Sequence, residues 1–356
     1  MRDKPDKRPR RGAQSNPHNR FEATESVPVE DAWWWQDDPS PIETQATPIQ
    51  AKSAISYNQS PDIPFDRSIN PYLGCEHGCI YCYARPSHAY WGLSTGTDFE
   101  SKIFVKSNIS SILEQELRRP SYQPATIALG SNTDAFQPLD RKFGLSRQIL
   151  ATLLKAKHPV AMVTKSALIL RDLDLLSELA KQDLVSVFVS ITTLDENLAR
   201  VMEPRAAAPQ MRLRVLHSLV EAGVPCGVMV APIIPALNDS ELEKILEAVA
   251  DLGATYAGYV YLRLPHELKS LFEEWLETHF PQRKNHVLSL IRQSRDGQLN
   301  QSDFGERMKG VGPFADLLRN RFQLACRRLH LNKRNWQLRT DLFIRPEKDD
   351  GQLSLF

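Results

Sequence analysis

The sequence predicts an α/β fold built on parallel strands, and three observations indicate it. Between residues 66 and 266, short apolar runs rich in β-branched residues alternate with longer amphipathic runs. Six such pairs follow one another, which is typical of parallel strands joined by right-handed helical crossovers. The apolar runs have few polar interruptions, as expected for a sheet that is buried on both faces.

In chain order, the predicted strands are residues 67–72, 125–130, 159–164, 185–192, 225–233 and 256–264. The helices between and after them are predicted at 107–118, 145–157, 168–182, 210–222, 240–252 and 267–279. In the fifth helix, Ser240 and Glu243 predict a capping box and Gly253 a C-terminal stop. An open doubly wound sheet and a barrel both satisfy this order. In a barrel, functional groups gather where strands end and βα-loops begin.

The segments on either side have a different composition. Residues 1–55 are polar and lack any sustained period, so we expect a disordered, basic tail, either simply solvated or a nucleic-acid arm. The expected core spans 56–280. A basic helical extension follows over 281–345, with helices at 282–294 and 312–329, and then a frayed tail over 346–356. The extension holds seven bases and no acid between Asp316 and Asp341. That strip is interpreted as the charged face of a helix or as a nucleic-acid contact.

Charge and cysteine content narrow the class of protein. Lys and Arg number 44 against 43 Asp and Glu, so net charge favours no particular partner. The sequence contains no run of about 18 apolar residues, so it predicts no membrane span. Its basic N-terminal residues are not followed by the apolar stretch that a secretory signal needs. We therefore expect a cytoplasmic protein. Three of its five cysteines lie within eight positions, which indicates a metal site rather than a disulfide framework.

These three cysteines, Cys75, Cys79 and Cys82, directly follow the first predicted strand with the spacing C-x3-C-x2-C. Three thiolates on a four-iron cubane would leave one iron open to a small molecule. A structural zinc needs four closed ligands. The fourth ligand would be His77, Cys226 or Cys326, so zinc stays an alternative, although the ligand chemistry favours the cluster.

With an aromatic residue, Tyr81, before the third cysteine, the loop resembles the signature of the radical S-adenosylmethionine superfamily. The resemblance implies a [4Fe–4S] cluster on the three cysteines, S-adenosylmethionine on its open iron, and Tyr81 along the adenine. It also implies reductive cleavage to a 5′-deoxyadenosyl radical that abstracts hydrogen from a substrate, and a reductant of the flavodoxin or ferredoxin type. The fold implied is a partial (β/α)6 barrel of the TIM type, in agreement with the six units above.

Three short motifs at the third, fourth and fifth predicted strands resemble a narrower group, the spore photoproduct lyase-like proteins. The motifs are Thr164-Lys165-Ser166, Ser190-Ile191-Thr192 and Val230-Ala231-Pro232-Ile233. The resemblance implies that Lys165 and Ser190 hold the carboxylate and ribose side of S-adenosylmethionine and that Ala231 lines its adenine. After the second strand, Ser131, Asn132 and Asp134 suit capture of the cofactor's ammonium group, or else an N-cap or Asx-turn.

The chain also departs from this group. Photoproduct lyases carry a cysteine at the end of the second strand, where this sequence has Gly130-Ser131-Asn132. This disfavours a DNA photoproduct lyase, and the substrate is not given by the sequence. The rival class is a nucleic-acid-binding protein with a structural zinc or a redox iron–sulfur site and no turnover. Glu203 and Arg205, after the fourth strand, would contact substrate or cofactor or form an ordinary solvated ion pair, and the ion pair is favoured. Cys226 is interpreted as a core residue.

Overall fold

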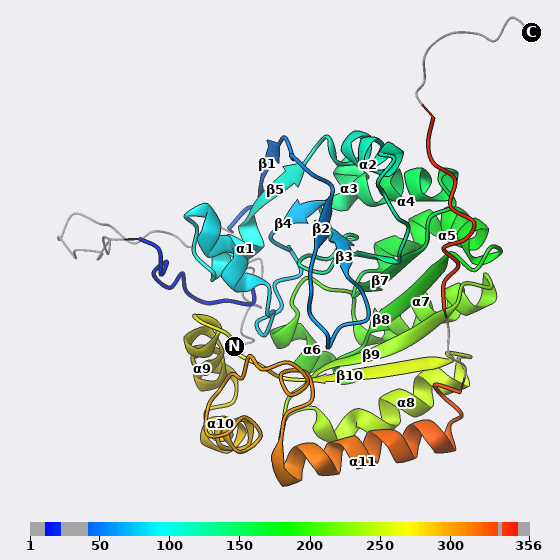
Figure 1. Ribbon diagram of the computed structural model, residues 1–356. Helices are drawn as coiled ribbons and strands as arrows, with labels where there is room; N and C mark the ends of the chain where they lie inside the picture. Colours follow the sequence, from blue (N-terminus) through cyan, green and yellow to red (C-terminus); the bar gives the residue numbers. More distant parts are fainter. Residues whose placement is uncertain (1–10, 23–41, 334–336, 348–356) are drawn as a thin grey trace, which may run out of the picture.

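The computed structural model describes residues 11–22, 42–333 and 337–347, and its centre is a curved seven-stranded sheet (Figure 1). The strand order is β10-β9-β8-β7-β6-β3-β2. From β3 to β10 all neighbours are parallel, and only the short edge strand β2 is antiparallel. Six parallel strands in an unclosed sheet confirm the predicted partial (β/α)6 barrel. The strands are β2 Ile55–Tyr57, β3 Arg67–Ile69, β6 Ile127–Leu129, β7 Val160–Thr164, β8 Val185–Ser190, β9 Cys226–Ile233 and β10 Tyr256–Tyr261.

Helices cover the outer face of this sheet and continue beyond its last strand (Figure 1). Each predicted helix is present, and most differences are of one to three residues at the ends. The exception is the third, whose first turns form a 3-10 segment. The helices are α1 Thr97–Ser101, α2 Ile109–Arg118, α3 Asp140–Phe143, α4 Leu145–Lys155, α5 Leu173–Ala180, α6 Glu196–Met202, α7 Pro209–Glu221, α8 Leu242–Asp251, α9 Leu268–His279, α10 Lys284–Gln293 and α11 Gly312–Arg328. The 3-10 segments are η1 Arg85–Trp91, η2 Ala167–Asp172 and η3 Asp239–Glu241.

A second, three-stranded sheet was not predicted. It has the order β1-β5-β4, formed by Gln45–Ile49, Lys102–Lys106 and Tyr72–Leu73. Strand β1 lies inside the segment expected to be disordered, and 11–22 also packs on the body. Backbone pairing with β5 holds β1, and polar contacts together with the buried Ala13 hold 11–22, so neither segment leaves a period in the sequence.

The predicted capping box on α8 is wrong. Glu241 occupies the N-cap position, and no side chain there donates or accepts a capping hydrogen bond. Glu241 instead accepts hydrogen bonds from Thr193 Oγ1 (2.5 Å) and the Leu194 amide (2.8 Å). Glu243 pairs with Arg321 of α11 at 2.6 Å. Tertiary hydrogen bonds and one ion pair therefore take the place of a local cap, whose contribution is only about 1 kcal/mol.

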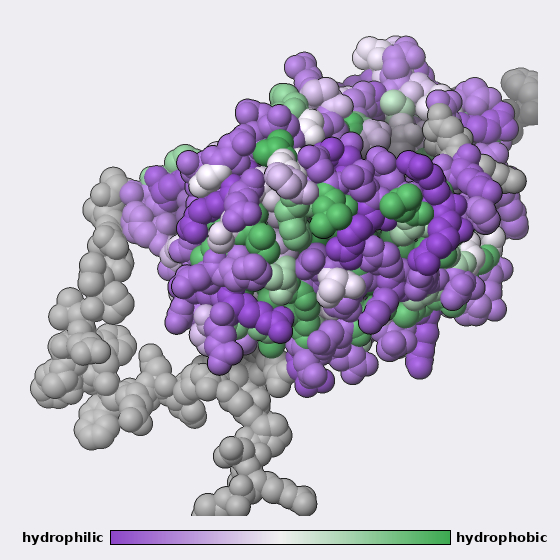
Figure 2. Space-filling model, turned by 90° about the horizontal axis from the view of Figure 1, so that it is seen from below, coloured by the Kyte–Doolittle hydropathy of each residue, from purple (hydrophilic) through white to green (hydrophobic). Residues whose placement is uncertain are grey.

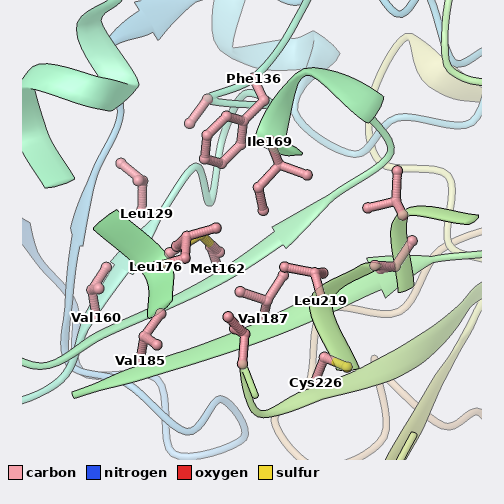
Figure 3. Close-up of a cluster of buried hydrophobic side chains, with 14 of the residues drawn as sticks. Leu129, Phe136, Val160, Met162, Ile169, Leu176, Val185, Val187, Leu219 and Cys226 are labelled. Carbon is pink, nitrogen blue, oxygen red and sulfur yellow. The ribbon is translucent and has the colours of Figure 1, made fainter. Parts of the chain in front are cut away.

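The main core lies between the sheet and its helices (Figure 3). Strand residues such as Met162 and Val187 meet helix residues such as Leu176 and Leu219, and all four are almost completely buried. Cys226 lies among them at the start of β9, which confirms its interpretation as a core residue.

The C-terminal extension packs through α11 against α8. The basic strip of α11 is largely matched by acids, since Arg321 pairs with Glu243, Arg328 with Glu247 and Arg319 with Asp316. Figure 2 shows this side of the molecule as mainly hydrophilic, with scattered apolar side chains. No helix within the described ranges is long and apolar enough to cross a bilayer.

Candidate functional site

The cysteine loop follows β4 and is folded by tight turns. The amide of Gly78 donates to the Cys75 carbonyl at 3.4 Å, and the amide of Cys82 to the Cys79 carbonyl at 3.2 Å. Gly78 has a φ of +66°, and a Cβ there would lie 2.6 Å from Glu100 Oε2, so only glycine fits this turn. The loop thus presents its three thiols from successive turns.

The thiols are buried to different degrees. Cys75 and Cys79 are nearly inaccessible, and Cys82 is half-buried. Burial raises the pKa of the Cys75 and Cys79 thiols, although the nearby Lys165 ammonium acts in the opposite direction on Cys79. Such thiols stay neutral until positive charge arrives, and a bound metal centre supplies that charge.

The fourth ligand that a zinc site needs would have to come from His77, Cys226 or Cys326. His77 Nδ1 faces Asp134 at 3.3 Å, while Cys226 and Cys326 pack in the main core, apart from the two clusters that contain the cysteine loop. Within the described part of the chain, no group of three His, Cys, Asp or Glu side chains is arranged to hold a single metal ion. None of the three predicted fourth ligands therefore completes a closed zinc site with the loop cysteines, and the donor set beside the loop is three thiols.

A buried ion pair beneath the loop fixes its carbonyls. Arg85 Nε donates to the Cys79 carbonyl at 2.9 Å, and its Nη2 donates to the Gly78 carbonyl at 3.2 Å and to Glu100 at 2.5 Å. Both Arg85 and Glu100 are fully buried. Sequence reasoning missed this pair because neither residue belongs to a motif, and no local pattern marks a buried charge.

The segment 11–22, here called the N-terminal arm, lies across the same loop. The amides of Gly12 and Ala13 each donate to a carboxylate oxygen of Glu100 at 2.8 Å. Further along, Ser15 donates to Glu274 at 2.6 Å and Arg20 pairs with Glu267 at 2.8 Å. The arm therefore bridges the cysteine loop to α9 (Figure 1).

The loop after β6 supports the cysteine loop from the other side. Asn70 donates to Ser131 Oγ at 3.2 Å and accepts from the Asn132 amide at 2.7 Å. Gln137 Oε1 accepts from the Glu76 amide at 2.8 Å. Ser131 and Asn132 thus lie beside the site, and their contact with a cofactor stays a prediction.

Asp134 is already occupied by protein donors. Its carboxylate accepts from Thr164 Oγ1 and the Lys165 amide, each at 2.8 Å, and from the Phe136 amide at 2.9 Å. The last bond is an Asx-turn, the alternative interpretation of this residue. Capture of an ammonium group by Asp134 stays a prediction.

The remaining predicted contacts come from neighbouring strand ends. The Lys165 ammonium lies 5.7 Å from the centroid of the Tyr81 ring. Ser190 Oγ donates to the Ala231 carbonyl at 3.2 Å, because β8 and β9 are adjacent in the sheet. The fold therefore brings Lys165, Ser190 and Ala231 to the same edge as the cysteine loop.

Glu203 is a functional candidate whose buried surroundings the sequence did not show. It is 3% exposed, so the favoured solvated ion pair with Arg205 is wrong, and Arg205 instead pairs with Glu76 at 2.9 Å. Tyr81 Oη and Thr192 Oγ1 both donate to its carboxylate, the latter at 2.6 Å, and Arg212 forms an ion pair with it. Arg212 also donates to the Ser190 carbonyl at 3.0 Å. Burial raises the pKa of Glu203, and the Arg212 charge opposes that rise.

Tyr83, on the other side of Cys82, is a second such candidate. Its hydroxyl donates to the Ser131 carbonyl, and the Arg263 guanidinium lies 5.1 Å from its ring centroid. Burial lowers the pKa of Arg263. The Tyr83 ring and the Arg263 guanidinium thus lie beside the cysteine loop, in addition to the site residues that the sequence predicted.

Comparison with known proteins places this arrangement in a family. The chain is similar to an uncharacterised protein of Mycobacterium tuberculosis, with 38% identity over 249 residues, or 68% of this chain and 73% of that protein. It is also similar to an uncharacterised protein of Methanocaldococcus jannaschii, with 29% identity over 66% of this chain and 83% of that one.

Among solved structures, the fold is similar to spore photoproduct lyase complexed with dinucleoside spore photoproduct. The TM-score is 0.59 at 15% identity, over 80% of this chain and 79% of that one. A mutant of the same enzyme with bound AdoMet and the dinucleoside scores 0.57. A family model of the radical SAM superfamily, where SAM is S-adenosylmethionine, matches residues 69–249, the span that holds the cysteine loop and most of the barrel strands. This chain therefore belongs to the radical SAM superfamily.

Proposed function

We propose that Cys75, Cys79 and Cys82 hold a [4Fe–4S] cluster and that the protein cleaves S-adenosylmethionine. When bound, the reduced cluster would supply the electron that splits the sulfonium and yields a 5′-deoxyadenosyl radical. The observation that carries the proposal is the meeting of three loop thiols with Lys165, Tyr81, Ser190 and Ala231 at one edge of a partial barrel.

The chain's own residues bind and orient the cofactor in this proposal. The Lys165 ammonium is the cation available to the cofactor's carboxylate, and the Tyr81 ring offers an apolar face to its adenine. Glu203 and Thr192 fix the Tyr81 hydroxyl, so the ring's orientation does not depend on the cofactor. The N-terminal arm and the Arg85–Glu100 pair hold the loop's backbone and cover it from water.

We infer that the substrate is DNA. The support is the fold shared with a lyase whose solved complex contains a dinucleoside photoproduct. The segment Gly130-Ser131-Asn132 holds no cysteine where photoproduct lyases carry one after the second strand, so the reaction would differ from theirs in its hydrogen donor.

The test is anaerobic reconstitution with iron and sulfide, followed by dithionite and S-adenosylmethionine, with 5′-deoxyadenosine measured by mass spectrometry. We expect about four irons per chain and product formation that Cys79→Ser abolishes. The matched control, Cys226→Ser, removes a thiol from the core rather than from the loop and retains product formation. A chain that takes up one zinc and forms no 5′-deoxyadenosine would contradict the proposal.

A second test addresses the substrate class. Undamaged and ultraviolet-irradiated duplex DNA, RNA and unmodified protein are each added to the reconstituted enzyme. We expect irradiated DNA to raise 5′-deoxyadenosine formation above the uncoupled background. Equal rates of 5′-deoxyadenosine formation with every additive would contradict DNA as the substrate, but not the cleavage of S-adenosylmethionine.

A further inference from the structure

The end of β10 carries an arginine beside the cysteine loop. Arg263 follows the strand by two residues and is partly buried. Its guanidinium lies 5.1 Å from the centroid of the Tyr83 ring, and Tyr83 is the chain neighbour of Cys82. Within the ranges that the structure describes, this guanidinium stacks on the ring but has no carboxylate or carbonyl oxygen at hydrogen-bond distance. Its N–H donors are therefore available to a ligand.

A second arginine fixes the backbone that carries Arg263. Arg295, in the loop between α10 and α11, is fully buried. Its Nη2 donates to the Leu262 carbonyl at 2.9 Å, and its Nη1 donates to the Glu306 carbonyl at 3.1 Å. These two carbonyls directly precede Arg263 and Arg307 in the chain. One buried side chain therefore sets the backbone position of both arginines.

The loop between α10 and α11 presents a second guanidinium on an aromatic ring. The Tyr261 amide donates to the Met308 carbonyl at 2.8 Å, which holds this loop beside the end of β10 (Figure 1). The Arg307 guanidinium lies 4.8 Å from the centroid of the Phe304 ring. Arg307 also forms an ion pair with Asp62 at 2.5 Å, so its charge is already matched.

The two stacks are neighbours, and only one of the two charges is matched. Burial lowers the pKa of Arg263, and the nearby Arg307 charge acts in the same direction. Both rings are open to solvent, since Tyr83 is 48% exposed and Phe304 is 57% exposed. An unmatched guanidinium beside exposed aromatic rings has the chemistry that holds a phosphate and stacks the bases of a nucleic-acid strand.

We propose that Arg263 binds a phosphate of the DNA substrate and that the Phe304 ring stacks against an unpaired base of the same strand. This site rests on the proposed DNA substrate and names the residues that hold it. Arginine suits a phosphate because its planar fork donates two parallel hydrogen bonds. Stacking on a ring does not depend on which base is present.

The position of Arg263 gives the site its purpose. Because Arg263 stacks on the neighbour of Cys82, a phosphate bound there brings its own nucleotide to the cysteine loop. Enzymes that react with a base take that base out of the duplex stack. A phosphate contact and an aromatic ring at the edge of the site would hold the strand in this opened form.

The test is the affinity of the full reconstituted protein for a fluorescein-labelled single-stranded DNA of about 12 nucleotides. Fluorescence anisotropy measures it anaerobically between about 50 and 200 mM salt. We expect Arg263→Met to weaken binding at least fivefold and to reduce the slope of log K against log salt by about 0.7, the value for one phosphate contact on a single strand. Arg263→Lys keeps the charge and should restore the slope. Phe304→Ala should weaken binding at least fivefold without changing the slope, because stacking releases no counterions.

The matched control is Arg327→Met. Arg327 is exposed in the last turn of α11, so this variant removes an equal charge from the basic strip rather than from the site. We expect its affinity to change less than twofold. Equal losses in the two methionine variants would show that general positive charge holds the strand, which overturns the proposal. Unchanged binding in Arg263→Met would overturn it as well.

Further readouts separate this site from other ligands. If Arg263 held the carboxylate of S-adenosylmethionine instead, Arg263→Met would weaken cofactor binding in equilibrium dialysis and leave DNA binding as in the wild type. That result would overturn the phosphate contact. Tighter binding of an RNA of the same sequence would overturn DNA as the ligand.

The failure of this site and the failure of the proposed enzyme also give different results. A protein that forms 5′-deoxyadenosine but binds no DNA would contradict the DNA site and not the cleavage reaction. DNA binding that depends on Arg263, in a protein that forms no 5′-deoxyadenosine, would contradict the enzyme and not the site.

Discussion

At the scale of single residues, the Glu203–Arg212 pair connects the cysteine loop to the end of β8. Glu203 accepts from Tyr81 and Thr192, and Arg212 donates to the Ser190 carbonyl. Both charges are almost completely buried, and the pair sets the orientation of a ring that the resemblance assigns to the adenine. No sequence signal marks the pair, since Glu203 lies in a Glu-Pro-Arg stretch that is typical of a solvated loop.

This pair gives a stability prediction. Arg212→Met leaves the Glu203 carboxylate buried without its counter-charge and should lower the free energy of unfolding by about 3–5 kcal/mol. The double variant, Glu203→Leu with Arg212→Met, removes both charges and should recover more than half of that loss. Denaturant titration of the purified protein measures both. A double variant no more stable than the single one would show that the ion pair is not the cause.

A second residue-level prediction concerns cofactor binding. Lys165→Met keeps the length of the side chain and removes the ammonium that lies near Tyr81 and Cys79. We expect the affinity for S-adenosylmethionine to fall at least tenfold in the reconstituted protein, with iron content unchanged. Equilibrium dialysis measures the affinity. Lys142→Met on α3 is the matched control. An equal loss of affinity in that variant would contradict a specific contact between Lys165 and the cofactor.

At the scale of elements, the N-terminal arm is the least expected feature. Its contacts to Glu100, Glu274 and Glu267 join the first βα-loop to the last barrel helix. The arm is polar and non-periodic, and disordered segments have the same composition. Composition therefore predicted disorder, whereas the contacts attach the arm to the folded body. The three consecutive tryptophans Trp33, Trp34 and Trp35, which would dock on the folded body or anchor a partner, lie outside the described residues.

The arm rests on one close approach that a substitution can break. A Cβ on Gly12 would lie 1.7 Å from the Gly78 carbonyl oxygen, so Gly12→Ala must lift the arm from the cysteine loop. We expect trypsin to cleave at Arg11 and Arg20 at least tenfold faster, while the far-ultraviolet circular dichroism of the barrel stays unchanged. Glu22→Ala, at an exposed position where the side chain pairs with His18 of the arm itself, should not alter cleavage. An arm that stays protected in Gly12→Ala would contradict its attachment to the loop.

At the scale of the whole molecule, stability should depend on pH through a histidine on the face opposite the site. His158 is fully buried between Tyr122 and the Pro159 carbonyl, and burial lowers its pKa to about 4. The unfolded chain, with an ordinary histidine pKa of about 6.5, binds the proton more readily than the fold does. Stability is therefore complete above about pH 6.5 and is lost progressively as the pH falls towards 4, by about 2 kcal/mol at pH 5.

His158→Gln tests this because a neutral amide does not titrate in that range. Urea unfolding at pH 8 and pH 5 should show a drop in the wild type that exceeds the drop in the variant by about 2 kcal/mol. Carboxylates titrate alike in both proteins and cancel in the comparison. Parallel pH profiles would show that His158 does not carry the dependence.

The sequence by itself determined the order of strands and helices and the cysteine loop, and the loop's resemblance pointed to the barrel. Apolar period and turn residues are local signals, so the six parallel strands, the helices and the C-x3-C-x2-C loop could all be predicted within a few residues. The loop's identity also depends only on nearest neighbours along the chain, and it led to the family.

Only the tertiary structure decided what surrounds that loop. Glu203 and Arg212, Arg85 and Glu100, and the N-terminal arm meet across long stretches of sequence, and their attraction depends on burial that no local pattern encodes. A carboxylate on a solvated loop and one buried against an arginine look alike in sequence. The physical difference is the water excluded when distant elements pack, and that is a property of the folded molecule alone.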